Sequence, residues 1–245
     1  MTSTNKLLLE AKGITKYFGT ITALENVNLK VHEGECLGVV GDNGAGKSTL
    51  MKVLSGLYKP SAGALFFEGK EHVLDSPKDS QNLGLEMVYQ DLALAGNLPI
   101  GENIFLGREP TKNIGFLKFL DFKKIQEMTS AHLEKLKINV KSAEQKVEEL
   151  SGGQRQAVAI ARSTAFNAKV VIMDEPTAAL AIKEVGKVLD LINKLKNTGV
   201  GVIVISHRMD DIFTVCDRVM ALFQGTNFAE SQSVSYTHLT LPTKA

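Results

Sequence analysis

The segment GDNGAGKST at residues 41–49 constrains the fold more than any other part of the chain. Its first eight residues fit the pattern G-x-x-x-x-G-K-[S/T], and they lie between an apolar run at 36–40 and a helical pattern at 47–57. Glycines let consecutive backbone N–H groups point at phosphate oxygens, and the start of the following helix adds the positive end of its dipole. The segment therefore predicts a phosphate-binding loop between a strand and a helix.

Two side chains of this loop have expected roles. Lys47 should bridge the β- and γ-phosphates of a bound nucleotide, and the Ser48 hydroxyl should ligate Mg²⁺. The residues expected to contact the nucleotide phosphates are Gly41, Asp42, Asn43, Gly44, Ala45, Gly46, Lys47, Ser48 and Thr49.

Short β-branched runs alternate with helical patterns, which is typical of an α/β fold with mainly parallel core strands. The early part of the chain indicates an antiparallel layer, with strands at 7–9, 21–24 and 27–31 and a hairpin at 64–73. The expected core strands are 36–40, 87–89, 170–173 and 200–205. The helical pattern at 183–196 joins the last two, so a right-handed βαβ unit is expected there.

From about residue 91 to 166 the pattern is mainly helical. A stripe at helical spacing predicts core packing of one helix, and it consists of Phe122, Ile125, Met128, Leu133 and Leu136. Residues 107–120 are rich in glycine and lysine and indicate a loop or small insertion, and a second helix is expected at 154–165.

Composition and charge narrow the class of protein. An apolar fraction of 44% with 22% charged residues is typical of a packed globular chain, and the net charge of +1 argues against a broad nucleic-acid surface. Cys36 and Cys216 lack the spacing of a metal site, which favours buried thiols. The start of the chain lacks the pattern of a secretory signal, and the aliphatic runs are far shorter than the roughly 20 residues that cross a bilayer.

Two adjacent carboxylates, Asp174 and Glu175, follow the buried run VVIM at 170–173. Ligands bind at the carboxyl ends of parallel strands, so Asp174 suits the Mg²⁺ shell and Glu175 is the candidate general base for an attacking water. An Asp-Glu pair at a strand end is more often a solvated helix cap. The phosphate loop earlier in the chain favours the catalytic interpretation.

A second glycine-rich stretch, LSGGQ, occupies residues 150–154, and we call it the signature segment. Ser151 and Gln154 fit an S-x-x-Q capping box at the start of a helix. That structural role leaves Gly152 and Gly153 unexplained, because glycine lowers helix propensity. A helix start with a serine hydroxyl and approachable amides is better explained as a second phosphate-binding site, and one nucleotide needs only one loop.

The motifs GDNGAGKST, VYQD (88–91), LSGGQRQ (150–156), VVIMDEP (170–176) and VIVISH (202–207) together resemble the ATP-binding subunit of an ABC transporter. The resemblance covers about residues 7–230. It implies an ATP hydrolase with a P-loop NTPase core, a mainly parallel sheet, an N-terminal antiparallel layer and an inserted helical lobe. Two such subunits meet head to tail, so the signature segment would bind the partner's ATP.

The same resemblance implies further roles. Phe18 would stack on adenine, Gln90 would lie near Mg²⁺ and relay to the membrane partner, and His207 would contact the γ-phosphate; a buried structural histidine is the alternative for His207. The implied partners are a second identical subunit, a transmembrane permease and, indirectly, an external solute-binding protein, with no nucleic acid. The implied location is the cytoplasmic face of a bacterial membrane.

One departure concerns the turn after Glu175-Pro176-Thr177. The family usually has a Ser-Ala-Leu-Asp-like sequence there, whereas this chain reads AALA at 178–181, which puts communication between two ATP sites in doubt. The same turn, together with residues 97–110, is similar to ATPases of simple-sugar importers of the ribose, xylose and fructose kind. The alternatives are another ABC importer or exporter, or a non-transport ABC ATPase. A guanine-specific switch protein is disfavoured because NKxD is absent.

These observations predict one ATP-binding domain over 5–232. Its core would comprise 5–90 and 167–232, and 91–166 would form the helical lobe. The Ser/Thr-rich end of the chain, SQSVSYTHLTLPTKA at 231–245, resembles a peptide read from sequencing-adapter DNA. We therefore expect 233–245 to be non-native and outside the fold, with a natural unstructured tail as the alternative.

Overall fold

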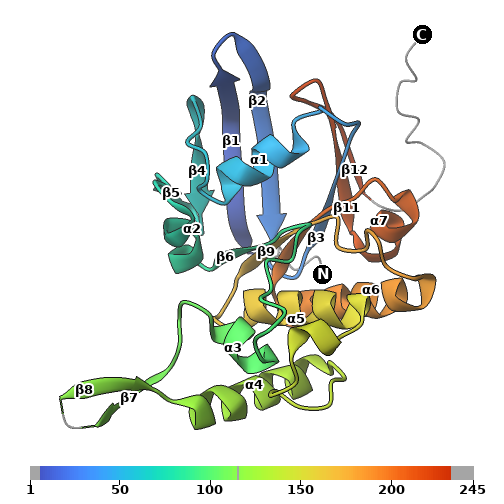
Figure 1. Cartoon of the computed structure of the whole chain (residues 1–245). Helices are drawn as coiled ribbons and strands as arrows, with labels where there is room; N and C mark the ends of the chain where they lie inside the picture. The colour runs from blue at the N-terminus through green and yellow to red at the C-terminus, as the bar shows by residue number, and fades with distance from the viewer. Residues whose placement is uncertain (1–5, 115, 233–245) are drawn as a thin grey trace.

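A computed structural model describes residues 6–114 and 116–232, and Figure 1 shows a sheet-rich upper part above a helical lower part. The central sheet has six strands in the order β12-β11-β3-β10-β9-β6. All neighbours pair in parallel except β12, which is antiparallel to β11 at one edge. The strands are β3 (Cys36–Val40), β6 (Leu85–Val88), β9 (Val170–Asp174), β10 (Gly201–Ile205), β11 (Arg218–Phe223) and β12 (Thr226–Gln232). The predicted mainly parallel core is confirmed.

Both faces of this sheet are covered, and alternate side chains enter different hydrophobic layers. In β9, Val171 and Met173 pack among the helices, whereas Val170 and Ile172 pack toward the antiparallel layer. Side chains of a strand alternate between faces, so a strand covered on both sides must be apolar at every position. This explains the continuous apolar run before Asp174.

A second, antiparallel sheet of four strands has the order β2-β1-β4-β5. Its strands are β1 (Leu7–Phe18), β2 (Ile21–His32), β4 (Ala62–Phe67) and β5 (Lys70–His72). The predicted layer and hairpin are confirmed, and the two early runs at 21–24 and 27–31 belong to one long strand. The turn between β4 and β5 has two residues with positive φ, Glu68 at 48° and Gly69 at 80°.

Helices α1 (Lys47–Leu54) and α2 (Pro77–Leu83) belong to the first half of the chain, and α6 (Ile182–Asn197) and α7 (Met209–Val215) to the second. Because α6 joins the adjacent parallel strands β9 and β10, the predicted βαβ unit is confirmed. Helix α1 ends at Leu54, three residues earlier than predicted. Gly56, with a φ of 75°, turns the chain out of the helical path there.

The lower part contains α3 (Ile100–Phe105), α4 (Phe122–Leu136), the short 3₁₀ helix η1 (Val147–Glu149) and α5 (Gly152–Thr164). Helix α5 begins two residues before the predicted start, because Ser151 takes the N-cap position. The segment interpreted as a loop at 107–120 contains two strands, β7 (Thr111–Ile114) and β8 (Leu117–Leu120), which pair as an antiparallel hairpin.

The predicted core stripe of α4 is partly wrong. Ile125, Leu133 and Leu136 are buried, but Phe122 is 51% and Met128 is 42% exposed. The buried face instead passes through Thr129, which is fully buried. Helical spacing brought all five side chains near one side, yet the neighbouring helices cover only part of that side.

Two expectations concern the whole chain. Among the described residues, no helix combines the length and hydropathy that crossing a bilayer requires. The proposed non-native segment 233–245 lies outside the described residues. Ser231 and Gln232, the first two residues of the Ser/Thr-rich run, pair with Val219 and Arg218 in the β11–β12 ladder and belong to the fold.

Candidate active site

The glycine loop at 41–46 joins β3 to α1, and the chain itself explains why glycine stands at its two ends. Gly41 has a φ of 150°, and a Cβ there would lie 2.4 Å from the carbonyl oxygen of Leu222. Gly46 has a φ of 101°, and its Cβ would lie 2.9 Å from the carbonyl oxygen of Ala23. Backbone packs directly against both positions, so any side chain would displace the loop.

Lys47 is held over this loop. Its Nζ donates to the carbonyl oxygens of Gly41 at 2.7 Å and Asp42 at 3.0 Å. Gly46 occupies the N-cap of α1 and provides no side-chain cap. The first turn of α1 therefore presents backbone N–H groups and a lysine ammonium together, which is the chemistry of an anion site.

The other predicted phosphate contacts lie in the same short segment. Asp42, Asn43 and Gly44 are exposed, and Ser48 is exposed on the first turn of α1, next to Thr49. Ala45 is buried, and its carbonyl oxygen accepts from the N–H of Gly225 at 3.0 Å. The Ala45 N–H donates to the carbonyl oxygen of Asp42 at 3.1 Å, so Ala45 anchors the loop through both of its backbone polar groups.

Three parallel strands bring the remaining candidates to the same edge of the sheet. Ile205 of β10 lies opposite Val39 of β3 on one side and Asp174 of β9 on the other. The glycine loop, the Asp174–Glu175 pair and His207 each follow one of these strand ends. The predicted convergence at the carboxyl edge is therefore present.

Glu175 and His207 interact directly. Glu175 Oε1 lies 2.8 Å from His207 Nδ1 and accepts from the His207 backbone N–H at 3.1 Å. The Glu175 side chain is mostly buried, whereas that of His207 is 69% exposed. Burial as a structural histidine is therefore wrong for His207.

The backbone at Glu175 is unusual, with a φ of 50°. Its N–H donates to the carbonyl oxygen of Ile205 at 2.9 Å, which ties the turn after β9 to the end of β10. Non-glycine residues held in the left-handed region are strained and concentrate at functional sites. The strain fixes the direction in which the carboxylate leaves the strand end.

Asp174 is half-buried beside Glu175. Burial is the main reason that the pKa of Asp174 is raised, the Glu175 carboxylate raises it further, and Lys47 and Lys52 oppose the shift. Asp174 therefore lies within electrostatic reach of Lys47, the first residue of α1, which Ser48 follows. Carboxylate and hydroxyl oxygens are the ligand types that suit Mg²⁺.

The structure places Phe18 and Gln90 at the margins of this region. Phe18 ends β1, is 42% exposed, and contacts Tyr58 edge-to-face with ring centroids 5.3 Å apart. The strand that pairs with it passes the glycine loop, since Ala23 and Leu24 lie against Gly46. Gln90 is exposed two residues after β6. Both side chains remain accessible to a ligand.

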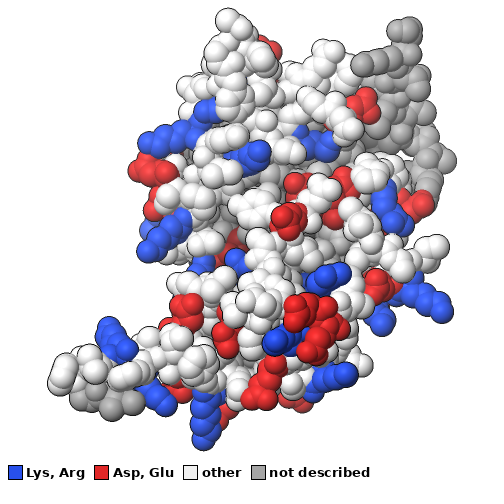
Figure 2. Space-filling view, in the orientation of Figure 1, with Lys and Arg blue, Asp and Glu red and all other residues white. Residues whose placement is uncertain are grey.

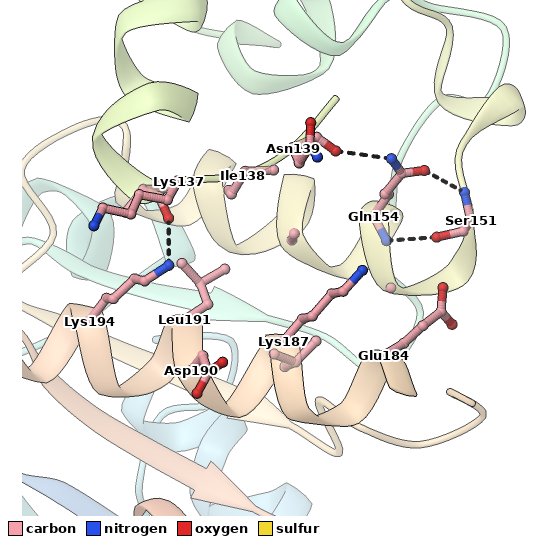
Figure 3. Close-up of a pocket in the computed structure, with 14 residues that line it drawn as sticks. Lys137, Ile138, Asn139, Ser151, Gln154, Glu184, Lys187, Asp190, Leu191 and Lys194 are labelled. Carbon is pink, nitrogen blue, oxygen red and sulfur yellow. Dashed lines mark hydrogen bonds between the residues drawn. The ribbon is translucent and has the colours of Figure 1, made fainter. Parts of the chain in front are cut away.

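The signature segment forms the predicted capping box. Ser151 Oγ accepts from the Gln154 N–H at 3.2 Å, and Gln154 Oε1 accepts from the Ser151 N–H at 3.0 Å (Figure 3). Gln154 Nε2 also donates to the carbonyl oxygen of Asn139 at 3.0 Å. In Figure 1 the first helix α1 and the helix α5 lie in separate parts of the molecule. One chain therefore does not bring its two glycine-rich segments together.

Glu184 was not predicted, and together with Leu180 it explains the two glycines of the signature segment. A Cβ on Gly153 would lie 2.8 Å from the Cβ of Glu184, and one on Gly152 would lie 3.2 Å from Leu180 Cδ2. The Ser151 hydroxyl and the Gly153 N–H hold the pKa of Glu184 below its usual range by hydrogen bonding to its carboxylate. The expectation that a helix cap has no need of these glycines is thus wrong, because Glu184 of α6 and Leu180 just before it approach too closely for side chains.

 The close approach also gives α5 and α6 a shared polar junction at their N-termini.

A cavity of about 550 Å³ adjoins this junction (Figure 3). Its lining comes from α5, α6 and the residues after α4, and it includes Ser151, Gln154, Glu184, Lys187 and Lys194. Lys194 Nζ donates to the carbonyl oxygen of Leu136 at 3.4 Å. None of the lining residues belongs to the glycine loop, so the cavity adjoins the signature segment and lies apart from that loop.

Three further residues, also missed by the sequence analysis, support the turns that carry Glu175 and His207. Thr177 is fully buried and its hydroxyl donates to Asp211 Oδ2, and Arg208 Nε lies 3.2 Å from the same oxygen. The contact joins positions 34 residues apart. The only local signal is the i,i+3 spacing of Arg208 and Asp211 at the start of α7.

Comparisons with known proteins agree with this geometry. The family pattern described as "ABC transporter" matches residues 24–178. The chain is 49% identical to the xylose/arabinose import ATP-binding protein of Sulfolobus acidocaldarius, over 89% of this chain and 85% of that protein. It is 44% identical to the fructose import ATP-binding protein of Rhizobium meliloti, over 86% of this chain and 83% of that protein.

Other relatives are longer. The chain is 42% identical to the galactose/methyl galactoside import ATP-binding protein of Escherichia coli K12, over 91% of this chain but 43% of that protein. Among solved structures, an ATP-binding cassette in its ADP conformation gives a TM-score of 0.82 at 29% identity, over 92% of this chain and 91% of that one. A dimeric bacterial cassette gives a TM-score of 0.76 at 28% identity, over 94% of this chain and 100% of that one.

Proposed function

We propose that this chain, which belongs to the ABC transporter family of ATP-binding cassettes, hydrolyses ATP to energise the import of a simple sugar. The observation that carries the proposal is the Glu175–His207 pair at the strand ends beside the glycine loop. The sugar-import assignment rests on the relatives named for xylose, arabinose and fructose import.

The chain's own residues divide the work at the ATP site. The N–H groups of the glycine loop and Lys47 Nζ would hold the β- and γ-phosphates. Glu175 would accept a proton from the attacking water, and the hydrogen bond from His207 would keep its carboxylate directed at that water. A Mg²⁺ ion held by Ser48 and Asp174, near Gln90, would neutralise phosphate charge. Phe18 would present its exposed ring to adenine.

The second glycine-rich segment supports a dimeric site. The separation of α1 and α5 within one chain leaves the signature segment free to reach a partner's ATP. In a two-fold dimer the contact would occur twice, with Ser151, Gly152, Gly153 and Gln154 of each subunit facing the other's glycine loop. Ser151 and the Gly153 N–H already donate hydrogen bonds to the carboxylate of Glu184. The start of α5 can therefore bind a negatively charged group.

A groove between the two parts of the molecule suits the permease. It encloses about 230 Å³ and is lined mainly by residues 86–89, 92–93 and 106–108, by part of α5 and by Phe166 after it. Arg108 spans its wall, with its guanidinium 2.9 Å from Glu86 and 4.7 Å from the centre of the Phe166 ring. Gln90 lies two residues after β6, the strand that supplies part of this lining, and it is proposed to lie near Mg²⁺. A permease segment in this groove could therefore sense the ATP site through Gln90. The subunit would then lie peripherally on the cytoplasmic face of the membrane.

A crosslinking experiment tests the dimeric site. Asn43 and Ser151 are exposed, so Asn43→Cys and Ser151→Cys introduce one accessible thiol in each glycine-rich segment. The natural cysteines can stay, because both are buried and burial raises the pKa of the Cys36 thiol. A disulfide needs Cα atoms within about 7 Å, so ATP-dependent linkage at double mass supports the shared site. Linkage within single chains would contradict it.

The transported class has a separate test. The subunit is assembled in vesicles with the permease and solute-binding protein encoded beside it. We expect pentoses or hexoses to stimulate ATP hydrolysis, and amino acids to leave it unchanged. Stimulation by an amino acid instead of a sugar would reassign the importer without affecting the ATP site.

A further inference from the structure

The β7–β8 hairpin carries a large apolar surface that the chain leaves uncovered. It projects from the lower part of the molecule, away from both sheets (Figure 1). Phe116 at its tip is 96% exposed, and Leu117 and Phe119 are about half exposed. Phe122, at the start of α4 directly after the hairpin, is also exposed. A two-stranded hairpin is marginally stable alone in water, so such a surface indicates a partner.

The pairing of the two strands determines which face of the hairpin each side chain lies on. Lys112 lies opposite Phe119, which places both on the same face as Leu117. The other face carries Thr111, Asn113, Lys118 and Leu120, of which only Leu120 is apolar. One face is therefore mainly apolar, and each face has one lysine that can extend past the apolar residues.

The charged residues around the hairpin are mainly positive. Residues 110–124 contain four lysines and one aspartate, in a chain whose net charge is only +1. Asp121 is committed to capping α4, where its Oδ1 accepts from the Lys124 N–H at 3.2 Å. Figure 2 shows the projection as mostly uncharged, with Lys or Arg side chains on and beside it. Exposed aromatic residues flanked by lysines are typical of surfaces that enter the interface of an anionic membrane.

We propose that this hairpin surface, formed by Lys112, Phe116, Leu117, Lys118, Phe119 and Phe122, binds the headgroup region of an anionic lipid bilayer. The cytoplasmic loops of membrane proteins carry an excess of Lys and Arg, so a permease would repel these lysines. Anionic headgroups attract them. The inference goes beyond the ATPase function, because the hairpin carries none of the residues assigned to the ATP site.

The position of the hairpin agrees with this assignment. Leu106, Gly107 and Arg108 line the groove assigned to the permease, and β7 begins at Thr111. A permease seated in that groove would bring the membrane to the same side of the subunit. The hairpin would then reach the lipid beside the permease.

The chain contains no tryptophan, so a single introduced one reports on the hairpin alone. Phe116→Trp is the probe, and Val73→Trp is its control, because Val73 is also strongly exposed next to a different hairpin. The full chain is titrated with vesicles of phosphatidylcholine, with or without phosphatidylglycerol. We expect the emission of Phe116→Trp to shift to shorter wavelength with the anionic vesicles only, and that of Val73→Trp to stay unchanged.

Charge variants in the probe background sharpen the test. Lys112→Ser and Lys118→Ser should each weaken binding to anionic vesicles roughly fivefold, whereas Lys70→Ser in the β4–β5 hairpin should not. High salt should weaken binding of the unmodified probe, because exposed charges are screened.

Several outcomes would overturn the proposal. These are the absence of a shift with anionic vesicles, an equal shift with neutral ones, or a shift that appears only with the permease in detergent. The last outcome would assign the hairpin to a protein contact. ATP hydrolysis is measured on the same samples, so a failure of the lipid proposal is distinct from a failure of the ATPase function.

Discussion

The two glycine-rich helix starts of this chain look alike in sequence but differ in what the rest of the chain does to them. At the glycine loop, carbonyl oxygens of Ala23 and Leu222 press against Gly46 and Gly41, and Lys47 supplies a positive charge. At the signature segment, a side chain of α6 approaches instead, and it brings the negative carboxylate of Glu184.

The difference shows that glycine can serve two purposes at a helix start. In the glycine loop it permits positive φ values and exposes amides to a ligand. In the signature segment it permits a second helix to lie close. The N–H groups at this helix start already donate to side chains of Ser151, Gln154 and Glu184. The glycine loop carries its own positive charge on Lys47, whereas at the signature segment an incoming phosphate must compete with a carboxylate.

The largest expected effect separates the chemistry of the two sites. Glu175→Gln should keep ATP binding but slow hydrolysis by about 10²–10⁴, the usual contribution of a general base. Glu184→Gln is the matched control, since it makes the same change at the signature segment, and it should alter the rate far less. Single-turnover hydrolysis and nucleotide binding measure the two effects. A normal rate in Glu175→Gln would remove Glu175 from the role of base.

The next prediction compares the glycines themselves. Gly46→Ala should lower the free energy of unfolding by about 2–4 kcal/mol, because it combines a left-handed backbone with contact against a backbone oxygen. Gly153→Ala should cost only about 1 kcal/mol, because a gain in helix propensity offsets part of the crowding against Glu184. Urea unfolding of both variants gives the values. Equal losses would show that the two segments are constrained in the same way.

A third prediction concerns the missing aspartate. Ala181 is the N-cap of α6 and makes no side-chain cap, with a φ of −66° and a ψ of 149° that suit a capping residue. Ala181→Asp should therefore raise the free energy of unfolding by about 1 kcal/mol. Ala181→Asn provides the control without charge. If Asn stabilises the fold and Asp does not, repulsion between the new carboxylate and Glu184 outweighs the cap. The stability of the α5–α6 junction would then depend on charge as well as on capping.

The smallest expected effect lies far from either site and supplies a baseline. Hydrogen bonds from Lys169 and Lys6 lower the pKa of Glu68 to about 2. A lowered carboxylate pKa stabilises the fold above the unfolded pKa of about 4.3, and this stability is lost as pH falls toward 2. The difference in unfolding free energy between the natural chain and Glu68→Gln should shrink over that range. Glu71→Gln, in the same hairpin, is the control and should show a weaker trend.

Much of the fold and the arrangement of the candidate site could be predicted because the signals are local. A fully apolar strand, a G-x-x-x-x-G-K-S loop and an S-x-x-Q box each specify their own structure within a few residues. The strand ends also placed Asp174, Glu175 and His207 together, since parallel strands share an edge.

The missed features depend on contacts distant in sequence. Glu184 follows Ser151 by more than thirty residues, and nothing near it signals that its carboxylate reaches another helix. Phe122 and Met128 have core spacing, but only the packed structure shows which part of α4 its neighbours cover. The β7–β8 hairpin has four-residue strands, too short for a clear alternation.

The positive φ of Glu175 has a consequence for how this chain can change over time. A left-handed conformation costs a non-glycine residue about 1–2 kcal/mol, which glycine would avoid. Relief of this strain at the proposed base would therefore favour stability and remove hydrolysis in the same step. Stability and activity pull in opposite directions at this position, so a screen that selects only for heat resistance would tend to discard the carboxylate.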